Sequence, residues 1–329
     1  MNNNQIKISV IITAYDRKQY ILRAVDSAFN QKIRGEFYEV IVVKNFVDIN
    51  IDTQLSNLGA RVYNSNTKAL GGKILEGIGK SNGDIICILE DDDYFYGDKL
   101  ETVLSEFESE PGLIFFQHSV DVVAIDNKRL ISRTKRSKDK ELEPPFSIKK
   151  VRNLVSSPSK SGIYNNSSYC FKKEVFEKNF GPFDEMVRAC DDFLFLSVLS
   201  SNGKIKLSKR TLSARTVNVS EKSDRESFSE FMNNAAAAEE ENLRTYDKYL
   251  DYFTSPATLE LSSYYFMRSF LRSAVFGKNR ITFSHLKKSI ALAFHLKDLY
   301  LPVLCFWGII SLISKEKVQH HFFSRESRR

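Results

Sequence analysis

The feature that most constrains the fold is the regular alternation of apolar, β-branched runs with amphipathic segments. Residues 6–15 form an almost uninterrupted apolar run, which is typical of a central parallel strand buried on both faces. Apolar side chains then recur at helical spacing over residues 17–30, and residues 37–43 again have strand character. This βαβ pattern predicts an α/β fold with a mostly parallel sheet that is flanked by helices.

The alternation continues to about residue 222. We predict a flexible loop in the charged segment 132–161, which contains serines and prolines. Further strands are expected at 60–63, 84–89, 113–120, 122–131 and 162–171 and near Ile205 and Leu212, and further helices at 69–80 and 98–109 and from Asp191.

From about residue 223 the pattern becomes helical. A predicted helix at 228–252 contains alanines and glutamates, which are strong helix formers, and Pro256 begins another helix. A chain of 329 residues exceeds the roughly 250 to 300 residues at which single cores stop growing. We therefore predict two domains, an α/β domain at 1–222 and a helical C-terminal domain at 223–329.

Bulk composition is that of a globular protein. The hydrophobic content of 42% and the charged content of 27% exclude wholesale disorder and a polytopic membrane protein. The polar start has no segment of the signal-peptide type, and the four cysteines lie far apart in sequence. We expect a cytoplasmic protein with reduced thiols.

The net charge of +7 suggests an anionic partner. Basic residues cluster at 128–150 and from residue 278 onward, without a recognisable nucleic-acid-binding motif, so we expect no nucleic acid partner. The apolar run 299–313 is shorter than the roughly 20 residues that span a bilayer. Residues 278–329 either contact the membrane surface through this run or bury it as a helix of the small domain.

Four consecutive acids, Glu90, Asp91, Asp92 and Asp93, follow the predicted strand 84–89. Acids at the carboxyl end of such a strand project into the crevice where open α/β sheets bind ligands. Adjacent like charges raise one another's pKa unless a cation neutralises them, and carboxylates suit Mg²⁺ and Mn²⁺, which also bind substrate phosphates. The cluster predicts a divalent metal that bridges to a diphosphate; the alternative is a solvated acidic turn.

Several segments resemble the inverting glycosyltransferases of family 2, which have the GT-A fold. Residues 8–17, with the sequence ISVIITAYDR, and the helix end Phe29-Asn30-Gln31 resemble the opening of that family. Residues 39–43, 77–86 and 89–93 match its second strand, the approach to its metal motif and the motif itself, in that order. The resemblance covers roughly residues 6–220 and implies a GT-A-type sheet with an α-helical region after it.

The resemblance also implies roles for individual residues. Glu90 is expected near the ribose or base, Lys73 near the diphosphate, and Asp93 in support of the metal ligand Asp92. It assigns nucleotide-sugar binding to Tyr15, Arg17, Lys73, Glu90 and Asp91, and binding of Mn²⁺ or Mg²⁺ to Asp92 and Asp93.

A second acidic pair, Asp191 and Asp192, resembles the family's Glu-Asp pair that supplies the catalytic base. Inverting transfer needs a carboxylate that takes the proton of the acceptor hydroxyl, while the metal stabilises the leaving diphosphate. We expect Asp192 to be the base and Asp191 to position it or the acceptor. The alternative is that both acids favour a helix N-terminus.

Three departures from the family pattern are visible. Lys44-Asn45 stands where the family often has two aspartates, Ile74-Leu75 replaces an Arg-Asn pair, and residues 215–218 lack a histidine. They motivate an alternative function as a non-catalytic nucleotide-sugar-binding or scaffold subunit. A sugar-1-phosphate nucleotidyltransferase and a dinucleotide oxidoreductase are disfavoured, because no glycine-rich loop follows the first strand.

The leading hypothesis is an inverting, metal-assisted glycosyltransferase. It would move a sugar from a nucleoside diphosphate sugar to a hydroxyl of a glycan or lipid-linked glycan. The polar segment 162–169 falls where the resembling enzymes line the acceptor side, although a half-exposed sheet edge explains its composition as well. The basic C-terminal region suggests an enzyme peripheral to the cytoplasmic membrane face.

Overall fold

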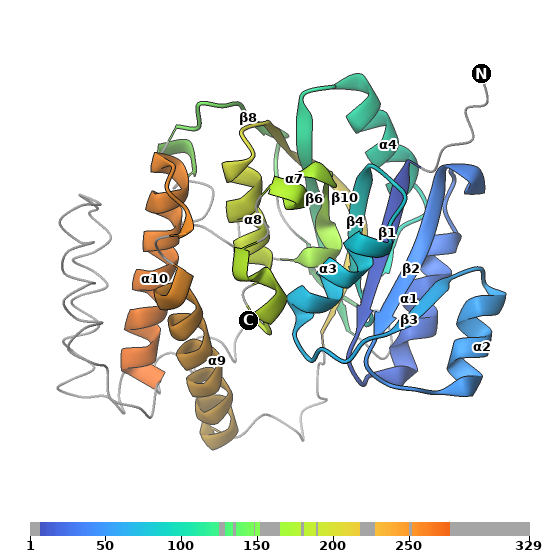
Figure 1. Cartoon of the computed structure of the whole chain (residues 1–329), viewed down its shortest axis with the longest axis horizontal. Coiled ribbons are helices and arrows are strands. Elements are labelled where there is room, and N and C mark those ends of the chain that lie inside the picture. The colour runs from blue at the N-terminus through green and yellow to red at the C-terminus, as the bar shows by residue number, and fades with distance from the viewer. Residues whose placement is uncertain are drawn as a thin grey trace. The chain divides into compact units, whose positions relative to one another are not determined.

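The chain divides into two compact units, Met1–Val219 and Ser220–Arg329, and each is described by itself. The architecture comes from a computed structural model (Figure 1). It describes residues 7–124, 129–133, 136–147, 149–151, 165–178, 181–188, 190–217, 228–249 and 252–276.

The first half of the sheet in the first unit is parallel, with β1 at its centre. β2 and β4 pair with β1 on either side, and β3 continues the sheet beyond β2. Every residue of β1 and β2 is buried, which explains their apolar sequences. These strands are β1 (Ile8–Ala14), β2 (Tyr38–Lys44), β3 (Arg61–Asn64) and β4 (Ile85–Glu90).

Helices cover both faces of this sheet. α1, α2 and α4 bury apolar side chains in one core with Val10 and Ile12 of β1, whereas α3 packs against Ile11 on the other face. α8 covers the same face as α3 further along, where the rings of Phe195 and Phe115 lie 5.8 Å apart. These helices are α1 (Lys18–Phe29), α2 (Ile49–Asn57), α3 (Leu70–Lys80), α4 (Lys99–Ser109) and α8 (Cys190–Ser200).

The second half of the sheet is mixed. β9 inserts antiparallel between β4 and β6, while β6 and β10 run parallel to each other. The order is β3-β2-β1-β4-β9-β6-β10-β5, with β7 on β6 and β8 on β10. The strands are β5 (Tyr94–Phe95), β6 (Leu113–Ala124), β7 (Leu130–Arg133), β8 (Lys140–Leu142), β9 (Tyr169–Lys172) and β10 (Lys204–Val217).

β9 brings together two cysteines that lie far apart in sequence. Cys87 of β4 and Cys170 of β9 are free thiols whose Sγ atoms lie 3.3 Å apart. Short helices complete the first unit. The short helices are η1 (Gly35–Phe37), η2 (Asn166–Ser168), α7 (Glu174–Lys178) and η3 (Gly181–Glu185).

Several predicted elements differ from the structure. The strands expected at 113–120 and 122–131 are one strand, β6, up to Ala124, because Asp121 is buried and accepts a hydrogen bond from the Tyr96 hydroxyl at 2.9 Å. The strands expected near Ile205 and Leu212 are likewise one strand, whose bulges accommodate the charged residues between them. A buried polar residue therefore does not end a strand when a side chain from a distant part of the chain forms a hydrogen bond with that residue.

The expectation of a flexible loop at 132–161 is wrong for β8. Leu142 is buried against the core, and Lys204 of β10 pairs with Glu141 at 2.9 Å. The strand expected at 162–171 begins only at Tyr169, because η2 precedes it. Residues 162–164 lie outside the described residues. α2 was not predicted; Asp48 caps it, and Leu55 is its buried residue.

The second unit is helical at the residues that the structure describes. α9 (Phe228–Tyr249) and α10 (Pro256–Phe276) pack together, with the rings of Tyr246 and Tyr265 stacked at 5.5 Å. Residues 278–329, on which the membrane expectation rests, lie outside the described residues. Within the described part of the chain, no helix is long and apolar enough to cross a membrane.

Two glycines of α3 test the packing of that helix on β1. A Cβ at Gly77 would lie 2.4 Å from Cγ2 of the buried Ile11, whereas a Cβ at Gly79 would meet nothing within 4 Å. We expect Gly77→Ala to lower the free energy of unfolding by about 1 to 3 kcal/mol through overpacking. Gly79→Ala should raise it by about 0.5 to 1 kcal/mol. Equilibrium urea unfolding followed by circular dichroism measures both; equal effects of the two substitutions would contradict the packing.

Candidate functional site

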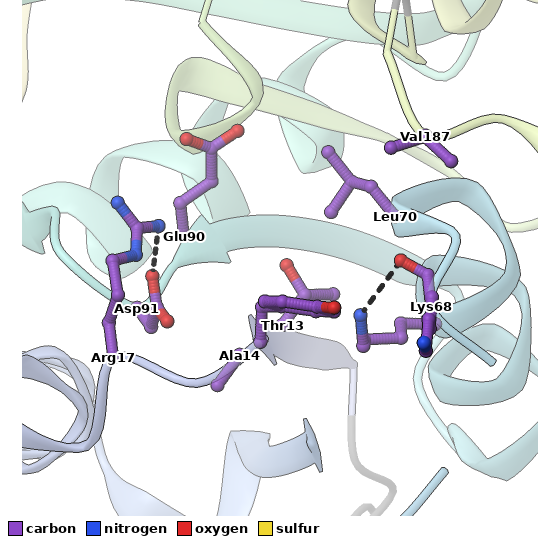
Figure 2. Close-up of a pocket in the computed structure, with 10 residues that line it drawn as sticks. Thr13, Ala14, Arg17, Lys68, Leu70, Glu90, Asp91 and Val187 are labelled. Atoms are coloured by element: carbon purple, nitrogen blue, oxygen red, sulfur yellow. Dashed lines mark hydrogen bonds and ion pairs between the residues drawn. The ribbon is translucent and has the colours of Figure 1, made fainter. Parts of the chain in front are cut away.

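The carboxyl ends of β1 and β4 meet at one edge of the sheet, and a pocket of ≈ 460 Å³ opens there (Figure 2). This is the edge at which open α/β sheets bind ligands. The pocket wall includes the end of β1, the start of α3 and the end of β4. The lining residues are Thr13, Ala14, Tyr15, Arg17, Lys68, Leu70, Lys73, Glu90, Asp91 and Val187.

The guanidinium of Arg17 joins two of the predicted acids. Its Nη2 donates to Oδ1 of Asp91 and its Nη1 donates to Oδ2 of Asp92. Figure 2 shows Arg17 reaching Asp91 from the loop after β1. Burial raises the pKa of Asp91 to about 6, against the opposing charge of Arg17. Arg17 therefore supplies positive charge where the sequence predicted a cation.

Lys73 and Tyr15 lie together in the wall of the pocket. The Lys73 Nζ lies 5.0 Å from the centre of the Tyr15 ring and donates to the Lys68 carbonyl at 3.4 Å. Burial lowers the pKa of Lys73, while the charges of Asp91 and Glu76 raise it. This pairing places a cation over the exposed aromatic ring of Tyr15 in the pocket wall.

Residues 165–167, which sequence reasoning did not assign to the donor site, hold the acidic cluster from one side. Asn165 Nδ2 donates to Asp93 Oδ2 at 3.1 Å, and Asn166 Nδ2 donates to Glu90 Oε1 at 2.9 Å. The Glu90 backbone N–H donates to Ser167 Oγ at 3.0 Å. Three consecutive small polar residues were the available signal, but their partners lie more than seventy positions away in sequence.

Beneath this turn lies a buried lysine, Lys99. Its Nζ donates to the Ser167 carbonyl at 2.8 Å and lies 3.4 Å from the centre of the Phe95 ring. Burial lowers the pKa of Lys99, and the nearby Cys170, Cys87 and Asp93 oppose that shift. Lys99 thus anchors the turn that contacts the acids.

β10 holds the cluster from the other side. The Thr216 backbone N–H donates to Asp93 Oδ1 at 2.8 Å, and its hydroxyl donates to the Asp92 carbonyl at 2.6 Å. Both carboxylate oxygens of Asp93 are therefore occupied by protein donors, with Asn165 on the second. Burial and the charges of Glu90 and Asp92 raise the pKa of Asp93 to about 7. Asp93 is not among the residues that line the pocket, and its hydrogen bonds with Asn165 and Thr216 fix the acidic loop.

The second predicted acidic group begins helix α8, within electrostatic range of Glu90 in the first. Asp191 and Asp192 lie in the first turn of α8, where the sequence expected a helix start. Burial raises the pKa of Asp191 to about 8, and the charges of Asp192 and Glu90 act in the same direction. Although Glu90 and Asp191 lie far apart in sequence, their carboxyl groups interact electrostatically in the fold.

The residues that depart from the family pattern have structural environments of their own. Lys44 is fully buried and pairs with Asp52 at 2.8 Å, so it stabilises the chain between β2 and α2. Ile74 is a buried core residue of α3. Arg215 is exposed at the end of β10, and its charge opposes the burial that raises the pKa of Glu90. Asn218 lies outside the described residues.

The carboxylates suit a metal that brings ligands of its own. Among the described residues, no group of three or more His, Cys, Asp or Glu side chains is arranged to hold a metal ion. Mg²⁺, however, usually binds one or two protein carboxylates together with substrate phosphates. Asp91 and Asp92 provide such a pair beside the pocket, and Asp91 Oδ2 is buried without a hydrogen-bond partner.

Comparisons with known proteins agree with this geometry. A profile of Glycosyl transferase family 2 matches residues 9–178. An uncharacterized glycosyltransferase of Nostoc sp. is 25% identical over 214 residues, which are 63% of this chain and 63% of that protein. The succinoglycan biosynthesis protein ExoO of Rhizobium meliloti is 24% identical over 212 residues, which are 60% of this chain and 57% of that protein. The chain therefore spans about three fifths of the length of these curated relatives.

Solved structures are similar in fold. TarS 1-349 of S. aureus in complex with UDP has a TM-score of 0.59 at 15% identity, over 97% of this chain and 92% of that one. The same fragment in complex with UDP-GlcNAc has a TM-score of 0.58 at 15% identity and covers the same shares. The likeness shows the GT-A arrangement of a central sheet flanked by helices, which confirms the predicted fold class.

The raised pKa of Asp191 predicts how stability depends on pH. Between the ordinary carboxyl pKa of about 4 and its folded value of about 8, the folded state holds a proton that the unfolded state has lost. Stability is therefore lost as pH rises through this window. Because asparagine cannot ionise, we expect Asp191→Asn to be more stable than the wild type at pH 9 by at least about 1 kcal/mol. The two should converge near pH 4.

Urea unfolding in EDTA at several pH values measures this difference. Asp184→Asn, at an exposed position of η3, is the matched control and should follow the wild-type profile. A difference between Asp191→Asn and the wild type that is the same at pH 4 and pH 9 would contradict the raised pKa of Asp191.

Proposed function

Because the chain belongs to glycosyltransferase family 2, we propose that it transfers a sugar from a nucleoside diphosphate donor to an acceptor hydroxyl, with inversion. The observation that carries this proposal is a pocket at the carboxyl ends of β1 and β4, where basic side chains adjoin one acidic group and a second acidic group lies within electrostatic range of Glu90. One group, Asp91 and Asp92, suits the donor diphosphate and its metal. The other, Asp191 and Asp192, suits the proton transfer from the acceptor.

The pocket suits a nucleoside diphosphate sugar. Arg17 and Lys73 supply positive charge for phosphate oxygens, and the partly exposed ring of Tyr15 supplies an aromatic face. S. aureus TarS, which has the same fold, is known in complexes with UDP and UDP-GlcNAc. We therefore expect the diphosphate between Arg17 and Lys73.

A divalent metal, Mn²⁺ or Mg²⁺, completes the donor site in this proposal. Asp92, with Asp91 beside it, would hold the ion, and Asp93 would fix the loop through Asn165 and Thr216. When bound, the metal stabilises the negative charge that develops on the leaving diphosphate. The protein contributes the fixed positions of the carboxylates.

A carboxylate of α8 acts as the base. At neutral pH the raised pKa of Asp191 favours its neutral form, which argues for Asp192 as the group that takes the acceptor proton. Asp191 then positions its neighbour, whose backbone N–H donates to Asp191 Oδ1 at 3.1 Å. Attack of the acceptor oxygen from this side, opposite the diphosphate, would invert the anomeric centre.

For the acceptor we propose a glycan or lipid-linked glycan. The similarity to ExoO, a succinoglycan biosynthesis protein, supports this class. Contact of residues 278–329 with the cytoplasmic membrane face stays a prediction, because those residues lie outside the described ones.

A second candidate is a non-catalytic nucleotide-sugar-binding subunit. It is favoured by Lys44 and Ile74, which are buried structural residues where the family often has polar ones. This candidate predicts that the chain binds a donor without consuming it.

Donor turnover by the full chain distinguishes the two functions. The purified protein is incubated with a panel of nucleoside diphosphate sugars and a detergent-solubilised lipid extract, with Mn²⁺, Mg²⁺ or EDTA. We expect one donor to release nucleoside diphosphate with metal, and Asp92→Ala and Asp192→Ala each to lower that rate by at least roughly 10²-fold. Nuclear magnetic resonance of the product should show an inverted anomeric configuration.

Asp98→Ala serves as the control for this assay. Asp98 forms a surface ion pair with Arg210 at 2.9 Å and does not line the pocket, so its loss should leave the rate unchanged. A donor that binds by calorimetry but is never consumed, with a full acceptor panel, would replace catalysis with the binding-subunit function.

A further inference from the structure

Arg17 occupies the carboxylates that the proposed metal needs. It bonds Asp91 through one terminal nitrogen and Asp92 through the other. A divalent cation that binds both carboxylates would lie within a few ångströms of this guanidinium. The ion and the guanidinium carry charges of the same sign and repel each other at such a short distance. The ion and Arg17 therefore compete for the same acids.

The surroundings of Arg17 leave it able to move. It lies immediately before α1, its side chain is 44% exposed, and it lines the pocket together with Tyr15 and Lys73. A rotation of the side chain would carry the guanidinium from the acids toward a ligand in the same pocket.

A second arginine of the same region has the opposite environment. Arg23 donates to the Asp92 carbonyl at 2.5 Å, and its guanidinium lies 5.6 Å from the Tyr20 ring centre and 5.4 Å from that of Tyr94. Contacts with two aromatic rings and a hydrogen bond to a backbone carbonyl hold Arg23 in place. Arg23 thus fixes the backbone of the acidic loop, whereas Arg17 neutralises the negative charge of the carboxylates.

We propose that Arg17 is a displaceable internal counter-ion of the donor site, an inference that rests on the proposed function. Without donor, Arg17 neutralises Asp91 and Asp92. When a nucleoside diphosphate and a divalent cation arrive together, the cation takes the carboxylates and Arg17 moves to the diphosphate. Arg17 thereby couples the binding of the metal to the binding of the diphosphate. A metal ion that binds alone must displace Arg17, and the arginine then has no new anionic partner.

This coupling has a measurable consequence in the absence of donor. Removing Arg17 removes the competitor, so Arg17→Gln should bind Mn²⁺ roughly tenfold more tightly than the wild type, as expected for the loss of charge-assisted hydrogen bonds. Titration of the full chain with Mn²⁺ alone, with free Mn²⁺ followed by electron paramagnetic resonance, gives the dissociation constant.

Lys18→Gln is the matched control. Lys18 is the next residue, carries the same charge, and pairs with Asp48 at 3.1 Å instead of with the acidic cluster. If the effect of Arg17 comes from its contact with Asp91 and Asp92, Lys18→Gln should leave Mn²⁺ affinity within roughly twofold of the wild type.

Thermal unfolding gives a second readout that also reports whether the variant folds. Without metal, Arg17→Gln should unfold at a lower temperature than the wild type, because Asp91 loses its partner while buried. Saturating Mn²⁺ should raise the unfolding temperature of Arg17→Gln more than that of the wild type.

Mn²⁺ affinity that is unchanged or weaker in Arg17→Gln overturns the proposal, and so does an equal gain in Lys18→Gln. Neither titration uses donor or acceptor. A chain that shows the Arg17 effect but turns over no donor in the earlier assay would lose the proposed transfer alone. A chain that transfers sugar without the Arg17 effect would lose this inference alone.

Discussion

The structure of the first unit depends on how the fold accommodates four adjacent carboxyl groups at the end of a buried strand. Each of these acids meets a donor or a cation from another part of the chain. Arg17 comes from the loop after β1, Asn165 and Asn166 come from the turn before β9, and Thr216 comes from β10. The antiparallel insertion of β9 places that turn beside the end of β4. The mixed second half of the sheet is therefore what encloses the acids.

This enclosure is incomplete in electrostatic terms. Burial raises the pKa of Asp91, Asp93 and Asp191 to about 6, 7 and 8. The free protein thus holds acids that are less stable as anions than exposed carboxylates, and added positive charge would stabilise them. Perturbed acids of this kind gather at functional sites, where stability is lower in return for ligand binding. Arg17 provides part of the missing charge, and the proposed metal would provide the rest.

Sequence patterns predicted the elements whose burial follows a regular period. β1, β2 and β4 are continuous apolar runs, and α1 and α3 have one apolar face, so these elements lie close to their predicted bounds. The predictions were wrong where a distant contact decides the local structure. β8 forms because Lys204 and the core hold Glu141 and Leu142, and η2 forms where its side chains contact the acids. In α2 the buried residue is Leu55, so the sequence of this helix lacks the repeated apolar positions that would have predicted it.

The sequence by itself determined the fold class, the family and the two acidic groups, because apolar periodicity and short motifs are local properties of the chain. Only the tertiary structure decided that Glu90 and Asp191 interact, that Arg17 bridges Asp91 and Asp92, and that residues 165–167 and Lys99 support the site. These partners are separated by tens of residues or more. Their contacts follow from strand order and register, which depend on how the whole sheet minimises exposed apolar surface and unpaired polar groups.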